Sequence, residues 1–420
     1  MNCTPKVRLL GCSHIRVVLS IFFTPYFINM ETIVVLQFIF KFCAVKIKYN
    51  CSICVIINSK HLLEVNREAK KCFQTLAISC MAFLPLNAFA SDELITGRGL
   101  PETYTEVTAQ KTTSGSTLIF SDSPEMVYRN GVLYRDTVSG DVRIFFHHVN
   151  AMESNKKLAV ILSNEQMRPV KYSVANNSIG NAGWHYLKVG KETQQKYFSG
   201  VHNKTEGNLG FGNNAELLTG KGYVLEPAQL LVGTIDLHTD RPVQVSVIMC
   251  DEKTDLDLYN EYAPVQPMDE HPLRGTFDDA DWNYTVSAPL NTDNNKVYML
   301  ELASEEQGFA RGKDGTTGKD AVNYGNYGIV YSVNFTISGN KPAAMYLNPL
   351  GGLFAGYGVL KKAGEEKILP LPQDKVAIGD SYDDLLKLGV LEPGTYSFIW
   401  SPPGASNLPV RLYWMQDGSL

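Results

Sequence analysis

The 420-residue sequence predicts an all-β protein of two β-sandwich domains, Ig-like or jelly-roll-like, with one or two short helices. Runs that alternate apolar and polar residues recur from residue 116 onward, the pattern of half-buried strands. Gly, Asn and Asp separate these runs at intervals typical of sandwich turns. After residue 90 the only cysteine is Cys250, so that part of the chain has no internal disulfide and apolar burial must stabilise it.

Residues 66–90 have the pattern of a secretory signal peptide. A basic segment (67–71) precedes an apolar run (72–86), and residues 88–90 (Ala-Phe-Ala) form a small-x-small cleavage site. We therefore expect cleavage after Ala90. The mature protein is then secreted, or lies at the cell surface or in the periplasm, with no membrane span.

Residues 1–65 differ from the rest of the chain in composition. They hold five of the eight cysteines and only two acidic residues. Two interpretations remain open: a spurious extension upstream of a true start near Val65, or a membrane-anchoring segment over the mostly apolar residues 15–45. Pro25, Asn29 and Glu31 interrupt that apolar stretch, which favours the first interpretation.

The charge of the mature part narrows the classes of partner. Residues 91–420 carry 28 Lys and Arg against 40 Asp and Glu, a net charge of −12. Nucleic acids and anionic membrane surfaces require basic patches, so neither is an expected partner.

The first predicted domain spans 91–252. A hairpin is expected about Asn130-Gly131, and turns at Ser139-Gly140 and at residues 240–242 (Asp-Arg-Pro). A helix is expected within 184–200, ended by Gly200. The strand-like runs are 116–121, 126–136, 141–150, 157–164, 170–176, 222–227, 229–238 and 242–250.

A linker with three prolines is expected over 253–275, and the second domain over 276–420. Within it we expect a long connection at 311–328, a hairpin turn at 338–340 (Ser-Gly-Asn) and a short helix at 380–391. The strand-like runs are 281–288, 296–303, 328–337, 342–348, 353–361, 367–372, 394–400 and 409–415.

The candidate metal ligands are His147, His148, Asp255 and Asp257. Adjacent residues of a strand point to opposite faces, so the two histidines cannot easily share one metal, and we expect one to face the core and the other solvent. The aspartates alternate oxygen ligands of the kind that Ca²⁺ prefers, but EF-hand spacing is absent, so a solvated acidic loop is favoured. No cofactor is expected.

Two aromatic pairs are candidate carbohydrate-binding residues. Trp184 with Tyr186, and Trp282 with Tyr284, are spaced two residues apart and could share one face of a strand. Exposed aromatic rings can stack on the apolar C–H face of a pyranose. Core packing is the favoured alternative for both pairs.

Residues 157–164, 231–249 and 326–358 (NYGIVYSVNFTISGNKPAAMYLNPLGGLFAGYG) resemble secreted Firmicutes-type proteins labelled as carrying a copper amine oxidase N-terminal-like (stalk) domain. The resemblance implies a surface or cell-wall β protein. It does not imply oxidase activity, because the Asn-Tyr-Asp-type site of the quinone cofactor and the HxH copper pair are absent.

These observations favour an exported, non-enzymatic β-sandwich protein that acts in ligand binding or surface architecture. Its expected partners are cell-wall or other polysaccharides, or surface proteins. The alternatives are a carbohydrate-active enzyme or carbohydrate-binding protein and, third, a metal-handling protein. The sequence identifies no catalytic residue, since neither a GxSxG elbow nor an SxxK motif occurs in a convincing context.

Overall fold

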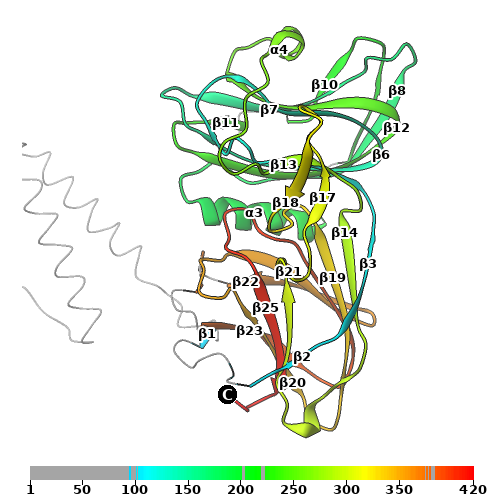
Figure 1. The fold of residues 1–420 in the computed structure, drawn as a ribbon, viewed down its shortest axis with the longest axis vertical. Coiled ribbons are helices and arrows are strands. Elements are labelled where there is room, and N and C mark those ends of the chain that lie inside the picture. Colours follow the sequence, from blue (N-terminus) through cyan, green and yellow to red (C-terminus); the bar gives the residue numbers. More distant parts are fainter. Residues whose placement is uncertain are drawn as a thin grey trace, which may run out of the picture. The chain divides into compact units, whose positions relative to one another are not determined.

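The computed structural model describes residues 94–95, 101, 103–200, 204–218, 223–373, 375–376, 378–379 and 384–420. All of them belong to one compact unit, Ala88–Leu420. The predicted extension (1–65) and signal peptide (66–90) lie outside the described residues. The described part is mostly β, which confirms the predicted fold class (Figure 1). Its helical elements are α3 (Tyr186–Ser199), α4 (Leu256–Tyr262) and a 3-10 turn over Thr292–Asn294.

The largest sheet of the described part has twelve strands. Its main path is β10 (Asn214–Glu216), β7 (Lys156–Ser163), β12 (Leu230–Asp251), β6 (Gly131–Asn150), β4 (Thr117–Ser121), β13 (Arg274–Phe277), β17 (Ala310–Lys313) and β18 (Asp320–Asn323). Beside this path pair β5 (Met126–Val127), β8 (Val170–Ile179), β9 (Thr205–Leu209) and β11 (Val224–Leu225).

Two smaller sheets form a sandwich, because one hydrophobic core takes side chains from both, such as Tyr331 and Trp414. The seven-stranded sheet has the order β22 (Glu365–Leu371), β21 (Gly356–Lys362), β24 (Gly394–Trp400), β19 (Val330–Ser338), β14 (Asp281–Val286) and β3 (Ala109–Ser114), with β15 (Leu290–Asn291) beside β19. The six-stranded sheet has the order β1 (Leu94–Ile95), β23 (Leu385–Leu391), β20 (Ala343–Asn348), β25 (Val410–Gln416), β16 (Tyr298–Leu302) and β2 (Thr105–Glu106).

The long strands β6 and β12 organise the twelve-stranded sheet. They pair antiparallel from Leu230↔Val149 to Met249↔Gly131, with register shifts between Thr239 and Val243 and between Val247 and Ile248. The first half of β12 also pairs with β8 and the second half with β7. A bulge at such a shift bends the strand, so the two halves of this one long pair can take different neighbours, β8 on the first half and β7 on the second.

Three predicted turns are therefore wrong. Ser139-Gly140 and residues 240–242 lie inside β6 and β12, where Gly140, with φ 78°, sits at the register shift. Asn130-Gly131 makes no hairpin, because β5 pairs with the far end of β6. A Cβ at Gly131 would meet the side chain of Gln266, so glycine there permits a close approach rather than a turn.

Two further expectations fail in the sandwich. Ser338-Gly339-Asn340 joins β19 to β20, which belong to different sheets, so it makes no hairpin. The helix expected over 380–391 is absent where the chain is described, since Leu385–Leu391 forms β23 and pairs with β20. Tertiary pairing outweighs the helix propensity of this leucine-rich segment.

The segment 311–328 is a hairpin rather than the expected long connection. Strands β17 and β18 pair antiparallel, and Asp314 begins their turn by accepting from the backbone N–H of Thr316 (2.8 Å). Arg274 donates to the buried Asp314 carboxylate at 3.2 Å. This ion pair fixes the hairpin on the end of the large sheet.

Strands from both predicted domains are interleaved in the sheets. β3 belongs with β14 and β19, while β13, β17 and β18 join strands of the first predicted domain. The division into 91–252, 253–275 and 276–420 stays a prediction.

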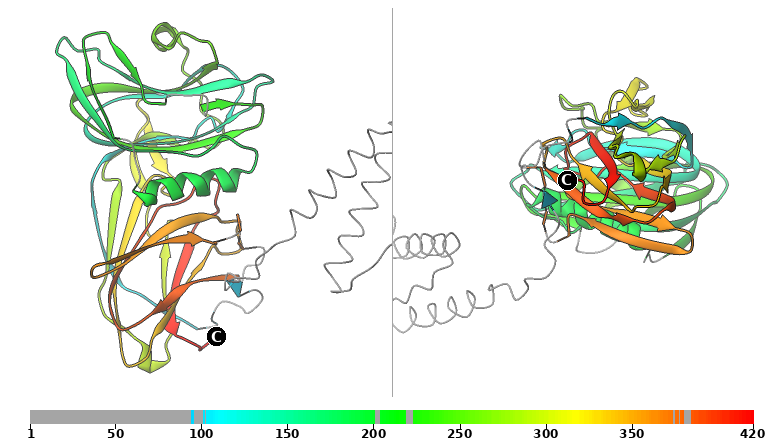
Figure 2. Two further views of the ribbon diagram at one scale, coloured as in Figure 1. Left: turned by 180° about the vertical axis from the view of Figure 1, so that it is seen from behind. Right: turned by 90° about the horizontal axis from the view of Figure 1, so that it is seen from below.

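Helix α3 begins at Tyr186 and ends before Gly200, which has φ 67° and is the predicted cap. Left-handed backbone of this kind favours glycine at a helix end. The helix contacts β8 and β12 on one side and β21 on the other (Figure 2). It therefore lies between the large sheet and the sandwich.

Candidate functional site

Trp184 is a large exposed aromatic side chain whose ring position is fixed. Its indole is 57% exposed, and Nε1 donates to the carbonyl oxygen of Pro227 at 3.0 Å. Tyr186, the first residue of α3, donates from its hydroxyl to the carbonyl oxygen of Ala228, also at 3.0 Å. We call these two rings the aromatic surface.

The backbone around residues 227–230 explains why these carbonyls are available. Gly183 pairs with Leu230 in an isolated bridge, which places Trp184 beside the start of β12. Ala228 has a left-handed backbone with φ 62°, and its N–H donates to the carbonyl of Asn150 at 2.7 Å. This turn directs consecutive carbonyl oxygens toward the two aromatic side chains.

Backbone hydrogen bonds also link this turn to β6 and β5, and a third exposed ring follows β5. Val127 of β5 pairs with Asn150 of β6, whose N–H in turn donates to the carbonyl of Gln229. Tyr128 follows directly and is 69% exposed.

Burial, with a smaller contribution from the Glu125 carboxylate, raises the pKa of Tyr186, so its hydroxyl remains a neutral donor.

The structure corrects the predicted geometry of this first pair. Trp184 and Tyr186 do not share a face of a strand, because Trp184 precedes the helix and Tyr186 begins it. The chain still brings the two together, through neighbouring carbonyl partners.

The second aromatic pair is buried. Trp282 and Tyr284 share the inner face of β14, with exposed fractions of 4% and 1%. Both pack on Tyr331, at ring-centroid distances of 5.7 and 5.8 Å. Lys111 Nζ lies 3.2 Å from the centroid of Trp282. These rings belong to the sandwich core, so they cannot form the predicted sugar-binding face.

Both adjacent histidines are buried, which corrects the expectation that one would face solvent. His147 Nδ1 lies 2.8 Å from Asp122. His148 Nε2 lies 2.8 Å from the Ser121 hydroxyl, and its Nδ1 lies 2.9 Å from the carbonyl of Pro124. The strand β6 has packed neighbours on both faces, so neither side chain reaches water.

The pKa values of the two histidines shift in opposite directions. Burial lowers the pKa of His148 to about 3, so this ring is neutral. Burial also opposes charge on His147, but Asp122 outweighs it and raises the pKa of His147. Burial raises the pKa of Asp122 to about 6 despite the attraction of His147.

The candidate metal ligands are not brought together. Asp255 caps α4 by accepting from the N–H groups of Asp257 and Leu258. Asp257 accepts from the side chain of Asn214 at 3.1 Å. In the described ranges, no group of three or more His, Cys, Asp or Glu side chains has the arrangement of a metal site.

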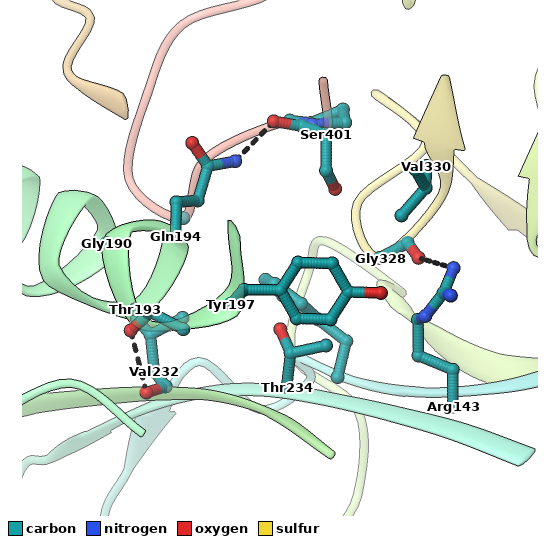
Figure 3. Close-up of a pocket in the computed structure, with 13 residues that line it drawn as sticks. Arg143, Gly190, Thr193, Gln194, Tyr197, Val232, Thr234, Gly328, Val330 and Ser401 are labelled. Atoms are coloured by element: carbon teal, nitrogen blue, oxygen red, sulfur yellow. Dashed lines mark hydrogen bonds between the residues drawn. The ribbon is translucent and has the colours of Figure 1, made fainter. Parts of the chain in front are cut away.

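A small cavity lies between α3, the large sheet and residues 401–404 (Figure 3). Its volume is about 10 Å³, roughly the space of one water molecule. Arg143 lines it and pairs with Asp236 (2.8 Å) and Asp281 (2.9 Å). Tyr197 donates to Asp236 at 3.0 Å. These groups satisfy one another, so the cavity is a structural junction between the sheets.

Sequence reasoning did not single out Arg143. The signal was available, because Arg143 is the only Lys or Arg within the apolar run 142–149. A charge in such a strand requires a buried partner. Burial opposes its charge, but Tyr197, Asp236 and Asp281 together raise the pKa of Arg143.

Two further findings concern the helices and the cysteine. Neither helix of the described residues is long and apolar enough to cross a bilayer. Cys250, the one cysteine after residue 90, is fully buried in a small apolar cluster, as expected for a structural thiol.

No protein-family model matches the chain, and no curated protein matches it. Among solved structures, the CUB1-EGF-CUB2 domains of rat MASP-1 align over 74% of this chain and 99% of that chain, with 8% identity and a TM-score of 0.17. Vicilin from tomato (Solanum lycopersicum) aligns over 71% of this chain and 86% of that chain, with 12% identity and a TM-score of 0.15. TM-scores this low do not establish a shared fold, so neither likeness bears on function.

Proposed function

We propose that the chain is an exported β-sandwich protein that binds carbohydrate at the cell surface through the aromatic surface of Trp184 and Tyr186. One observation carries this proposal: Trp184 is 57% exposed and yet held in place by the hydrogen bond to Pro227. A ring that is already immobilised loses little conformational entropy when a ligand stacks on it. A pyranose offers the apolar C–H face that such a ring binds.

The export part of the proposal rests on the signal-peptide pattern of residues 66–90. The resemblance to secreted Firmicutes-type β proteins agrees with it. The mass of the N-terminal peptide of the protein recovered from its own culture medium tests this part directly. We expect a mature chain beginning at Ser91, and a peptide from within 1–60 would contradict it.

Tryptophan fluorescence tests the carbohydrate part. The chain has four tryptophans, and Trp282, Trp400 and Trp414 are buried. Iodide therefore quenches mainly Trp184. We expect soluble neutral oligosaccharides, such as those derived from cellulose, chitin or xylan, to protect Trp184 from the quencher.

Isothermal titration of variants supplies the controls. Trp184→Ala should weaken oligosaccharide binding roughly tenfold, while Trp184→Phe should retain part of it. The matched control is Tyr262→Ala, which removes a 74% exposed ring at the end of α4. No protection by any oligosaccharide, or an equal loss in Tyr262→Ala, would overturn the proposal.

A further inference from the structure

Four adjacent strands of the seven-stranded sheet carry a field of uncharged polar side chains on their outer face, interrupted by Ile399 and bordered by Val330. In β19 every second residue is buried in the core, and the intervening residues point outward. The same alternation holds in β24 and over most of β14. No residue of β3 is buried, and Gln110 and Thr112 lie on the outer face because they pair with Thr285 and Asn283. We call the outward set over β3, β14, β19 and β24 the hydroxyl–amide face: Gln110, Thr112, Asn283, Thr285, Ser332, Asn334, Thr336, Thr395 and Ser397.

Strand pairing aligns these side chains in rows. One row runs from Gln110 through Thr285 and Asn334 to Ser397. Rows on one face of a sheet repeat about every 6.8 Å along the strands, and neighbours across strands lie about 4.8 Å apart. Apart from Ile399, which lies opposite Ser332, the face is therefore a regular grid of hydrogen-bonding groups.

The hydrogen-bonding capacity of this face is largely unused. Thr336 and Thr395 lie 3.1 Å apart, hydroxyl to hydroxyl. Within the part of the chain that the structure describes, the other seven side chains hydrogen-bond to no other protein group. Hydroxyls and primary amides each offer both donors and acceptors to an incoming partner.

The face also lacks free charge, although residues 91–420 carry a net charge of −12. Two charged residues at its edges are paired with other residues. Asp281 binds Arg143 at 2.9 Å, and Lys361 binds Glu366 at 2.9 Å. A charged polymer would find no counter-charge in the grid.

We propose that the hydroxyl–amide face is a docking surface for a neutral polysaccharide in extended or insoluble form. A neutral polymer of hydroxyl groups matches the face in charge and in hydrogen-bonding type. A protein partner fits less well, because interface cores are enriched in aromatic residues, Met and Arg and depleted in Ser. Short side chains on strands also lose little entropy when they are immobilised.

The net gain per hydrogen bond is small, because each replaces a bond to water. Binding therefore requires many contacts at once, which a long or insoluble polymer supplies and a short oligosaccharide does not. The inference does not depend on the aromatic surface, because it uses other residues and another form of ligand.

Adsorption of the purified full chain to microcrystalline cellulose and to chitin tests the proposal. Thr285→Glu and, separately, Thr395→Glu each place a charge at an exposed position of the grid. The matched control is Thr205→Glu, on the exposed β9 strand of the large sheet. Thermal melts of each variant confirm that it folds.

We expect the binding constant for at least one polymer to fall about tenfold in both grid variants and to stay unchanged in Thr205→Glu. Adsorption equal to wild type in folded grid variants would overturn the proposal, and so would adsorption to neither polymer. Self-association of the wild-type chain in sedimentation, abolished by Thr285→Glu, would show a protein interface instead and also overturn it.

The two carbohydrate proposals fail separately. If Trp184→Ala loses oligosaccharide binding but adsorbs to the polymers normally, the result supports the aromatic surface and does not test the hydroxyl–amide face. If Thr285→Glu loses adsorption while oligosaccharides still protect Trp184 from iodide, the result supports the hydroxyl–amide face and does not test the aromatic surface.

Discussion

Trp184 with Tyr186 and Trp282 with Tyr284 share the same spacing in the sequence but have opposite environments. The first pair lies at the start of α3, with an exposed indole held by a backbone carbonyl. The second lies on the inner face of β14, packed on Tyr331. The same spacing thus has different results, because the elements that hold the residues decide whether a ring lies in the core or at the surface.

The largest expected difference is in stability. Trp282→Ala should lower the free energy of unfolding by about 3–5 kcal/mol, because it empties a large buried site. Trp184→Ala should cost only about 1 kcal/mol, since it removes an exposed ring and one hydrogen bond. Urea unfolding of both variants measures this difference. Equal losses of unfolding free energy in the two variants would contradict the different environments assigned to Trp184 and Trp282.

The two adjacent histidines extend the comparison to protonation. His148 is kept neutral by burial, with a pKa of about 3, whereas its pKa in the unfolded chain is ordinary, about 6.5. Between these values the unfolded chain binds the proton and the folded chain does not. Acidification below 6.5 therefore removes stability through His148, by about 1.4 kcal/mol per pH unit.

His148→Gln tests this sign. At pH 7 the substitution should destabilise the protein, because it disturbs the hydrogen bonds to Ser121 and Pro124. The difference from wild type should shrink as the pH falls from 7 to 4, because only the wild type must keep an imidazole unprotonated. Urea unfolding at three pH values decides the point, and a constant difference would contradict the assignment.

The alternation of apolar and polar residues predicted the strands of the sandwich, and β19 shows it at every position. The same alternation indicates that the second aromatic pair is buried, because Trp282 and Tyr284 alternate with Asp281, Asn283 and Thr285. Trp184 has no such alternation and follows a glycine directly before a helix.

The predictions that the structure contradicts share a physical cause. Gly140 and residues 240–242 serve as turn signals and as bulge residues with equal ease, so the sequence does not distinguish a hairpin from one long bent pair. Residues 385–391 suit a helix or a strand, and the pairing with β20 decides. The anchoring of Trp184 by Pro227 depends on a contact across 43 residues, which local pattern does not contain.

The smallest expected effects come from the two tyrosine hydroxyls. Tyr186 donates to Ala228 at 3.0 Å, so Tyr186→Phe should lower the free energy of unfolding by about 1 kcal/mol. The hydroxyl of Tyr284 is buried and has no hydrogen-bond partner in the described part of the chain. Tyr284→Phe removes this unsatisfied group and should leave stability unchanged or raise it slightly. Urea unfolding compares the pair under one condition, and a larger loss in Tyr284→Phe would indicate a bound water at that hydroxyl.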